Sequence, residues 1–287
     1  MTLGYRDGVA VAELAVYLPS AIVGLYLTII NEFHTSGWID ILLFSIIRIV
    51  GSAIQLDAKN HPGTTKFYTI AAIMNSIGLA PLQAGSLGLL NRLNDNIRKN
   101  DRTPINNNVF RIVQIIIIVG LVLGVVGGIK SGENIGKTAG GFTVNGTSKA
   151  GSVLLIGVFA LTLLLTARIF RFVSHADREY RRLLWAVMAA TLPIGVRLVY
   201  AILATLTQDK DFNFITGNTT AWLCLAVVPE TIIICIYIAV GLSLGHPNKR
   251  SHYKGERCSP AGLEAADEAS GKKESILPLF PSESRTP

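Results

Sequence analysis

Seven long apolar blocks divide the chain, and they constrain its fold more than any other feature. A helix needs about 20 mainly apolar residues to cross a bilayer core of about 30 Å. Seven segments are long and apolar enough: 8–30, 38–57, 67–90, 110–130, 149–172, 182–206 and 219–244. Only 16% of the residues are charged, against roughly 25% in soluble domains. The pattern predicts an all-α, polytopic membrane protein, a seven-transmembrane helix bundle over residues 1–245 in contact with the lipid bilayer.

Four prolines, Pro19, Pro81, Pro193 and Pro229, fall inside these blocks. Proline is tolerated within membrane helices, where neighbouring groups can satisfy the freed carbonyl, so we keep each block as one helix. The first block contains Glu13 and has no small-residue cleavage site. We therefore expect it to be retained as a helix and not removed as a signal peptide.

Loop charges predict the orientation. Fourteen Lys and Arg residues lie near 92–111, 168–182 and 249–257, against seven on the opposite side. Because positive loops favour the cytosol, the N-terminus is predicted outside. The sequon asparagines Asn145 and Asn218 then also lie outside, as candidate glycosylation sites. The net charge of +7 is attributed to loops facing an anionic leaflet, and no nucleic-acid partner is expected.

Residues 246–287 differ in composition from the rest of the chain. They mix Lys, Glu, Ser, Pro and Gly around one short apolar patch at 276–280. Such a segment buries too little apolar area to offset the entropy of ordering. We predict a disordered cytosolic tail, which could carry a binding motif for a cytosolic partner.

Four ionisable residues stand within the predicted spans: Glu13, Arg48, Arg197 and Glu230. Each costs roughly 2.5–3.5 kcal/mol at mid-membrane when unpaired, and their signs balance. Pairing of Glu13 with Arg48 and of Arg197 with Glu230 is geometrically reasonable in a helix ring. The polar side chains expected beside them are Asn75, Gln83 and Tyr200.

Two interpretations of these charges stay open. In the first they pair and specify helix register; in the second they line a polar intramembrane site that binds a ligand or relays a proton. Alanine at Arg48 or Arg197 should lower abundance under the first interpretation, and should abolish activity at normal abundance under the second.

Two further patterns concern helix packing. Gly120, Gly124 and Gly128 form a small-residue stripe that permits close helix approach, either within the bundle or in a homodimer; the oligomeric state stays open. Arg48 and Pro81 are spaced almost like Arg197 and Pro229. This spacing is compatible with two parallel three-helix repeats joined by the fourth helix, a transporter-like arrangement.

No catalytic constellation, metal-ligand spacing or cofactor motif is present in the sequence. There is no HExxH motif, and the segment 85–88 lacks the leading glycine of a nucleophile elbow. We therefore expect neither an enzyme nor a bound metal or cofactor.

Several stretches carry a family resemblance: 8–13 with Tyr17 and Pro19, 37–51, 77–90, 192–200 and Pro229 with Glu230. At these residues the chain resembles a fungal seven-transmembrane family of uncharacterised integral membrane proteins, classed as a domain of unknown function. The resemblance covers about residues 5–245 and implies the seven-helix fold without an activity. A looser likeness, of topology alone, links it to fungal lipid-translocating exporters.

The favoured functional hypothesis is a multi-pass membrane protein, in the plasma membrane rather than endomembranes, that binds or translocates an unknown small molecule at its polar intramembrane site. One alternative is a sensory receptor that signals through its cytosolic loops and tail. Another is a structural membrane protein without a ligand.

Overall fold

Long α-helices make up almost all of the described chain. The computed structural model describes residues 4–30, 37–58, 70, 73–74, 77–99, 105–133, 145–172, 178–207 and 218–244. No strand occurs among these residues, which confirms the all-α prediction for them. The predicted tail at 246–287 lies outside the described residues.

Helix bounds follow the apolar blocks closely. Helices α1, α2, α5, α6 and α7 cover Tyr5–Ile30, Trp38–Ala58, Asn107–Glu133, Gly146–Phe170 and Arg178–Ile202. Helix α7 continues into a π-helical segment, η2 (Leu203–Thr207), and the last crossing consists of α8 (Thr219–Trp222), the π-helical η4 (Leu223–Val227) and α9 (Val228–Ser243). Within the described residues, six such segments are long and apolar enough to cross a membrane. This is the architecture of a multi-pass membrane protein in contact with lipid.

The structure describes the predicted span 67–90 only in part, at residues 70, 73–74 and 77–90. The helix in this region, α4, covers Leu79–Lys99, and Gly78 forms a turn immediately before it. Pro81 lies in the first turn of α4, where its missing N–H costs little, and is not a mid-helix interruption. The helix runs beyond residue 90 because Asn91–Lys99 contains no Gly or Pro to end it; apolar content marks the membrane, not the helix end.

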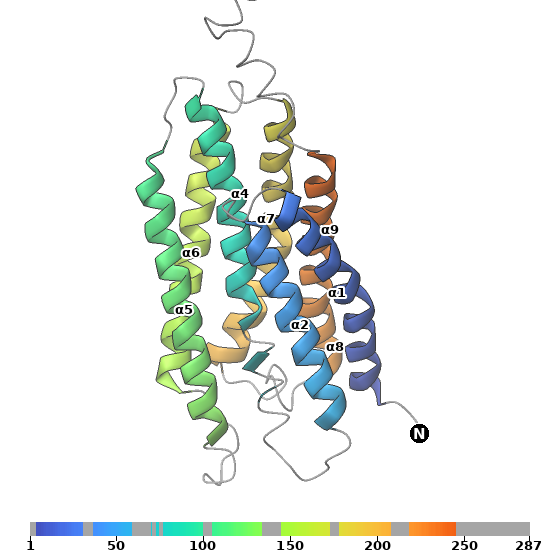
Figure 1. The fold of residues 1–287 in the computed structure, drawn as a ribbon. Helices are drawn as coiled ribbons and strands as arrows, with labels where there is room; N and C mark the ends of the chain where they lie inside the picture. The colour runs from blue at the N-terminus through green and yellow to red at the C-terminus, as the bar shows by residue number, and fades with distance from the viewer. Residues whose placement is uncertain are drawn as a thin grey trace, which may run out of the picture. The chain divides into compact units, whose positions relative to one another are not determined.

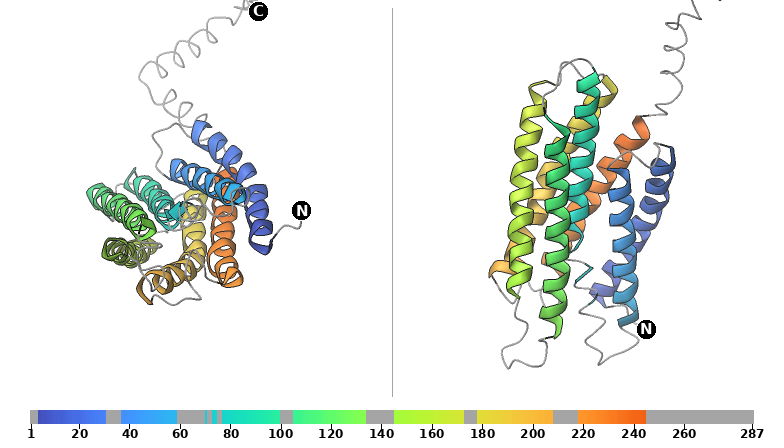
Figure 2. Two further views of the ribbon diagram at one scale, coloured as in Figure 1. Left: turned by 90° about the horizontal axis from the view of Figure 1, so that it is seen from below. Right: turned by 60° about the vertical axis from the view of Figure 1, so that its left-hand side comes forward.

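The helices of residues 4–244 pack as a bundle in which α4 connects the two sides. Helices α1 and α2 pack together on one side, α5 and α6 pack together on the other, and α4 and α7 lie between them (Figures 1 and 2). Helix α9 packs on α7 and touches α1 only weakly. Every residue from Gly78 to Leu90 is buried, since α4 contacts α2, α5, α6 and α7. The outward faces carry exposed apolar side chains such as Ile22, Leu164 and Leu192.

Glycines allow α5 and α6 to approach closely. A methyl group added to Gly151 of α6 would lie 2.9 Å from both the Gly120 carbonyl oxygen and the Gly124 backbone nitrogen of α5. Gly128, the third member of the stripe, faces Ile73 instead. The first two stripe residues therefore form a packing face within the bundle, where a larger residue on the partner helix would push the backbones apart.

We predict that Gly151→Leu destabilises the protein, because the new side chain meets backbone atoms of α5 that cannot rotate away. Overpacking of this kind costs about 1–3 kcal/mol. Gly157 on the same helix has nothing within 4 Å of an added methyl group, so Gly157→Leu is the matched control. The unfolding midpoint in detergent should fall for Gly151→Leu and stay near wild type for Gly157→Leu; equal midpoints would contradict the assigned interface.

Candidate functional site

The four intramembrane charges meet in one buried network. Arg48 Nη1 donates to Glu13 Oε1 at 3.3 Å, and Arg197 Nε donates to Glu230 Oε1 at 2.6 Å. Arg48 Nη2 also donates to Glu230 Oε2. Both ion pairs suggested by the sequence are thus present, and Arg48 joins them into a single chain of four charges.

Helical spacing aims these side chains at one another. On α2, Arg48 and Ser52 are four residues apart and share a face, so Ser52 Oγ reaches Glu13 Oε2 at 2.6 Å while Arg48 reaches its other oxygen. On α1, Tyr17 follows Glu13 by the same interval, and its hydroxyl lies 3.4 Å from Thr231 Oγ1 of α9. Four helices, α1, α2, α7 and α9, therefore each supply one charge to the network.

Two aromatic rings and the turn that precedes α4 lie next to the network. The Arg48 guanidinium lies 5.7 Å from the centre of the Phe44 ring, and that of Arg197 lies 5.6 Å from the centre of the Tyr200 ring. At Gly78 a methyl group would lie 3.3 Å from Glu230 Oε1, so the turn before α4 brings backbone close to this carboxylate. The positive N-terminal end of α4 adds a favourable field there.

The four charged side chains of the network are almost fully buried. Glu13, Arg48, Arg197 and Glu230 are 3%, 2%, 1% and 0% exposed. Buried charges are tolerated when each is paired and hydrogen-bonded, and removing one partner leaves the other as an uncompensated buried charge. With two carboxylates and two guanidiniums the network is formally neutral, so its first physical role is to fix how the four helices meet.

One edge of the network nevertheless borders a cavity. A groove of about 430 Å³ lies between α1 and the η4–α9 segment, and it is lined by Gly4, Tyr5, Gly8, Val9, Ala12, Glu13, Val16, Leu223, Val227 and Thr231. Its walls are mainly apolar, and Glu13 is the charged group that lines it. The volume lies within the roughly 300–1,000 Å³ of ligand pockets.

Small residues on α1 keep this groove open. Gly8 and Ala12 are four residues apart and so lie on one face of the helix, and Gly4 immediately precedes the first turn. All three are exposed, and an added methyl group at Gly8 would meet nothing within 4 Å. Because α1 packs tightly on α2 and only weakly on α9, the face with the small residues is left facing a hollow.

Of the other predicted polar residues that the structure describes, Tyr200 contacts the network and Gln83 has a partner elsewhere. Tyr200 lies against Arg197, as described above, whereas Asn75 lies outside the described residues. Gln83 is buried on α4 and donates through Nε2 to the Leu155 carbonyl of α6 at 3.1 Å. The structure thus places Gln83 at a helix interface away from the four charges.

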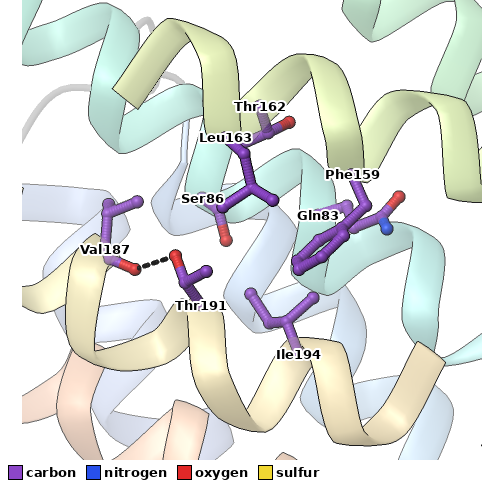
Figure 3. Close-up of a pocket in the computed structure, with 8 residues that line it drawn as sticks. All are labelled: Gln83, Ser86, Phe159, Thr162, Leu163, Val187, Thr191 and Ile194. Carbon is purple, nitrogen blue, oxygen red and sulfur yellow. Dashed lines mark hydrogen bonds between the residues drawn. The ribbon is translucent and has the colours of Figure 1, made fainter. Parts of the chain in front are cut away.

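A small cavity beside Gln83 is drawn in Figure 3, between α4, α6 and α7. Its volume is about 10 Å³, which is room for about one water molecule. The hydroxyl groups at its edge donate to carbonyls of their own helices, as with Thr191, which donates to the Val187 carbonyl at 2.8 Å. The cavity is therefore too small for an organic ligand.

Both sequon asparagines serve as helix N-caps. The Asn145 side chain accepts from the Thr147 backbone N–H at the start of α6, and Asn218 accepts from the Thr220 N–H at the start of α8. This arrangement gives the two asparagines a structural use that does not depend on a glycan. Among the described residues, no group of three His, Cys, Asp or Glu side chains gathers as metal ligands would.

Sequence reasoning missed four residues of the site: Tyr17, Ser52, Gly78 and Thr231. Ser52 and Tyr17 could have been found, since each lies four residues after a predicted charge on a helix and shares its face. Gly78 and Thr231 carry no such signal. Their importance comes from helix breaks and contacts between distant segments.

We predict that Arg48→Ala is among the most damaging single substitutions in this chain. It removes the arginine that pairs with Glu13 and one of the two arginines that pair with Glu230, and breaking a buried pair costs about 3–5 kcal/mol. Arg197→Ala should cost less, because Glu230 keeps Arg48. The yield of monodisperse protein and its unfolding midpoint measure both effects, with exposed Arg111→Ala as the control; a wild-type midpoint for Arg48→Ala would refute the assigned pairing.

Comparison with known families assigns the chain without giving it an activity. A family model described as Domain of unknown function (DUF7702) matches residues 3–247. This match covers all of the described helices, so the chain belongs to this family. No curated protein and no solved structure matches the chain.

Proposed function

We propose that this member of the DUF7702 family is a membrane-embedded binding protein that takes up a small molecule in the groove between α1 and α9. One observation carries the proposal: the groove of about 430 Å³ ends on Glu13, a member of the buried charge network. An apolar pocket that converges on a few polar groups is the usual form of a ligand site. We propose no catalytic activity, metal or cofactor for it.

Binding is better supported than translocation. A translocation path would have to pass the ion pairs of Arg48 with Glu13 and Glu230, all nearly fully buried. Opening such pairs without replacement partners is costly. Translocation would therefore require a second conformation in which the ligand itself replaces one of these contacts.

We further propose seven spans, with α4 as the seventh. The support is its burial: α4 lies within the bundle, enclosed by α2, α5, α6 and α7, and its polar end begins only after residue 90. Loop charges support an outside N-terminus and a cytosolic tail available to a cytosolic partner. We propose the plasma membrane as the location of the protein. The family resemblance supports a fungal origin.

The parallel-repeat hypothesis gains support from the site. The proposed halves, α1–α2–α4 and α6–α7–α9, each contribute one arginine from their second helix, Arg48 and Arg197. Each also has an irregular third helix, with a turn at Gly78 before Pro81 and the π-helical η4 before Pro229. Interrupted segments at corresponding positions of two halves are a pointer to a binding site in membrane proteins.

The proposed orientation predicts that a tag at the C-terminus is reached by antibody only after cells are permeabilised. A tag at the N-terminus should be reached in intact cells, because an odd number of spans puts the ends on opposite sides. Surface labelling of intact and permeabilised cells measures this. Both tags appearing on the same side would overturn the seven-span topology.

For the groove, we predict that Gly8→Leu removes a bound small molecule while leaving the fold intact. The leucine fills the hollow without meeting backbone, and every member of the charge network remains. Native mass spectrometry of the purified protein should show a non-covalent adduct on wild type and on the control Gly157→Leu, and its loss on Gly8→Leu. An adduct of equal intensity on all three proteins would contradict the proposed site.

Alanine variants of the arginines cannot make this test, since burial of Arg48 and Arg197 predicts their destabilisation whether or not a ligand binds. Gly8→Leu separates ligand binding from structural stability. Gly8 lines the groove together with Glu13, but a methyl group added to it contacts none of the ion-paired side chains. A structural protein without a ligand would tolerate the substitution with no change in bound material.

A further inference from the structure

Hydrogen-bond capacity at the groove restricts the chemistry of its occupant. The polar side chains along its inner part are Glu13 and Thr231, with Tyr5 exposed at the opposite end. An ionised carboxylate accepts about four hydrogen bonds and donates none. Glu13 receives two, from Arg48 Nη1 and Ser52 Oγ, so it retains room for further donors.

Thr231 also offers only an acceptor to the groove. Its hydroxyl donates to the Val227 carbonyl at 2.9 Å within the helix. Since that proton is committed, the 3.4 Å contact with Tyr17 is one in which the Tyr17 hydroxyl donates. The Thr231 oxygen has one further lone pair, and both hydroxyl protons are already used.

The rest of the groove demands an apolar occupant. Val9, Ala12, Val16, Leu223 and Val227 form its walls, and Gly8 and Ala12 are exposed on the outer side of α1. In a bilayer these exposed positions face the acyl chains, so the groove opens sideways to lipid. A molecule dissolved in the bilayer can enter it without crossing water.

We infer that the groove binds a membrane-borne amphiphile with an aliphatic body and a head that donates hydrogen bonds through hydroxyl or amino groups. The inference rests on the proposed function and adds its ligand class. Such a head completes the free acceptor positions of Glu13 and Thr231. A carboxylate head meets acceptors only and a second negative charge, so it is rejected even when its chain is identical.

Three chain-matched photoreactive probes test the class: a long-chain amine, alcohol and carboxylic acid, each with a diazirine at the same chain position. The full-length protein is labelled in nanodiscs of neutral phospholipid, and adducts are mapped by peptide mass spectrometry. We expect the amine and the alcohol to label 4–16 and 223–231 at least fivefold more than the acid. Gly8→Leu should reduce this labelling to background, and Gly157→Leu should keep it.

Thr231→Val supplies a second variant that leaves all ion pairs in place. It removes one acceptor and keeps the shape of the wall, so labelling by the alcohol should fall severalfold. Unchanged labelling would overturn the role given to Thr231 and, with it, the acceptor argument.

The remaining outcomes separate the ligand class from the proposed function. If the acid labels the groove as strongly as the amine, and Gly8→Leu abolishes both, the donor-headed class is wrong and a binding groove stands. If no probe labels the groove above the level of Gly8→Leu, the inference fails; when the native adduct is also absent, the proposed function fails with it.

Discussion

The Arg48 guanidinium is the contact on which the arrangement of this bundle depends. It binds a carboxylate of α1 and a carboxylate of α9, while its own helix packs along α1. Helices α1 and α9 touch each other only weakly, so this one side chain holds together segments that their own surfaces would not. Arg197, which lies on α7, pairs with the second of these carboxylates, that of Glu230 on α9. Each of the four charges alone would oppose insertion into the membrane, but together they form ion pairs that specify how the four helices pack.

Much of the architecture follows from the sequence because lipid imposes a simple rule. Apolar length predicts, within a few residues, the six described segments that are long and apolar enough to cross a membrane. The rarity of charge in such segments is enough to pick out the four members of the network. The start of α4 could not be predicted in this way. It depends on a turn at Gly78 that fits between Phe44, Arg48 and Glu230, three residues from two other helices.

The partners of two polar side chains also depend on contacts between helices, which the sequence does not give. Gln83 and Tyr200 both looked suited to the site, yet Gln83 donates to the α6 backbone and Tyr200 lies over Arg197. Two stripes of small residues likewise have opposite outcomes. Gly120 and Gly124 meet a glycine of α6 at close range, whereas Gly4 and Gly8 face a hollow. A stripe of small residues permits two helices to approach closely, but whether they do so depends on which helix lies opposite the stripe.

The groove and the charge network share one irregular segment. Pro229 has no N–H to give to the carbonyl four residues earlier, and the turn before it is π-helical, as is often found at functional sites. This same turn presents Leu223 and Val227 to the groove, and the helix that follows presents Glu230 to the two arginines. A molecule seated against η4 therefore presses on the segment that positions Glu230. The wall of the groove and the carboxylate that binds both arginines thus belong to one continuous helical segment, so the shape of the groove and the position of Glu230 depend on the same backbone.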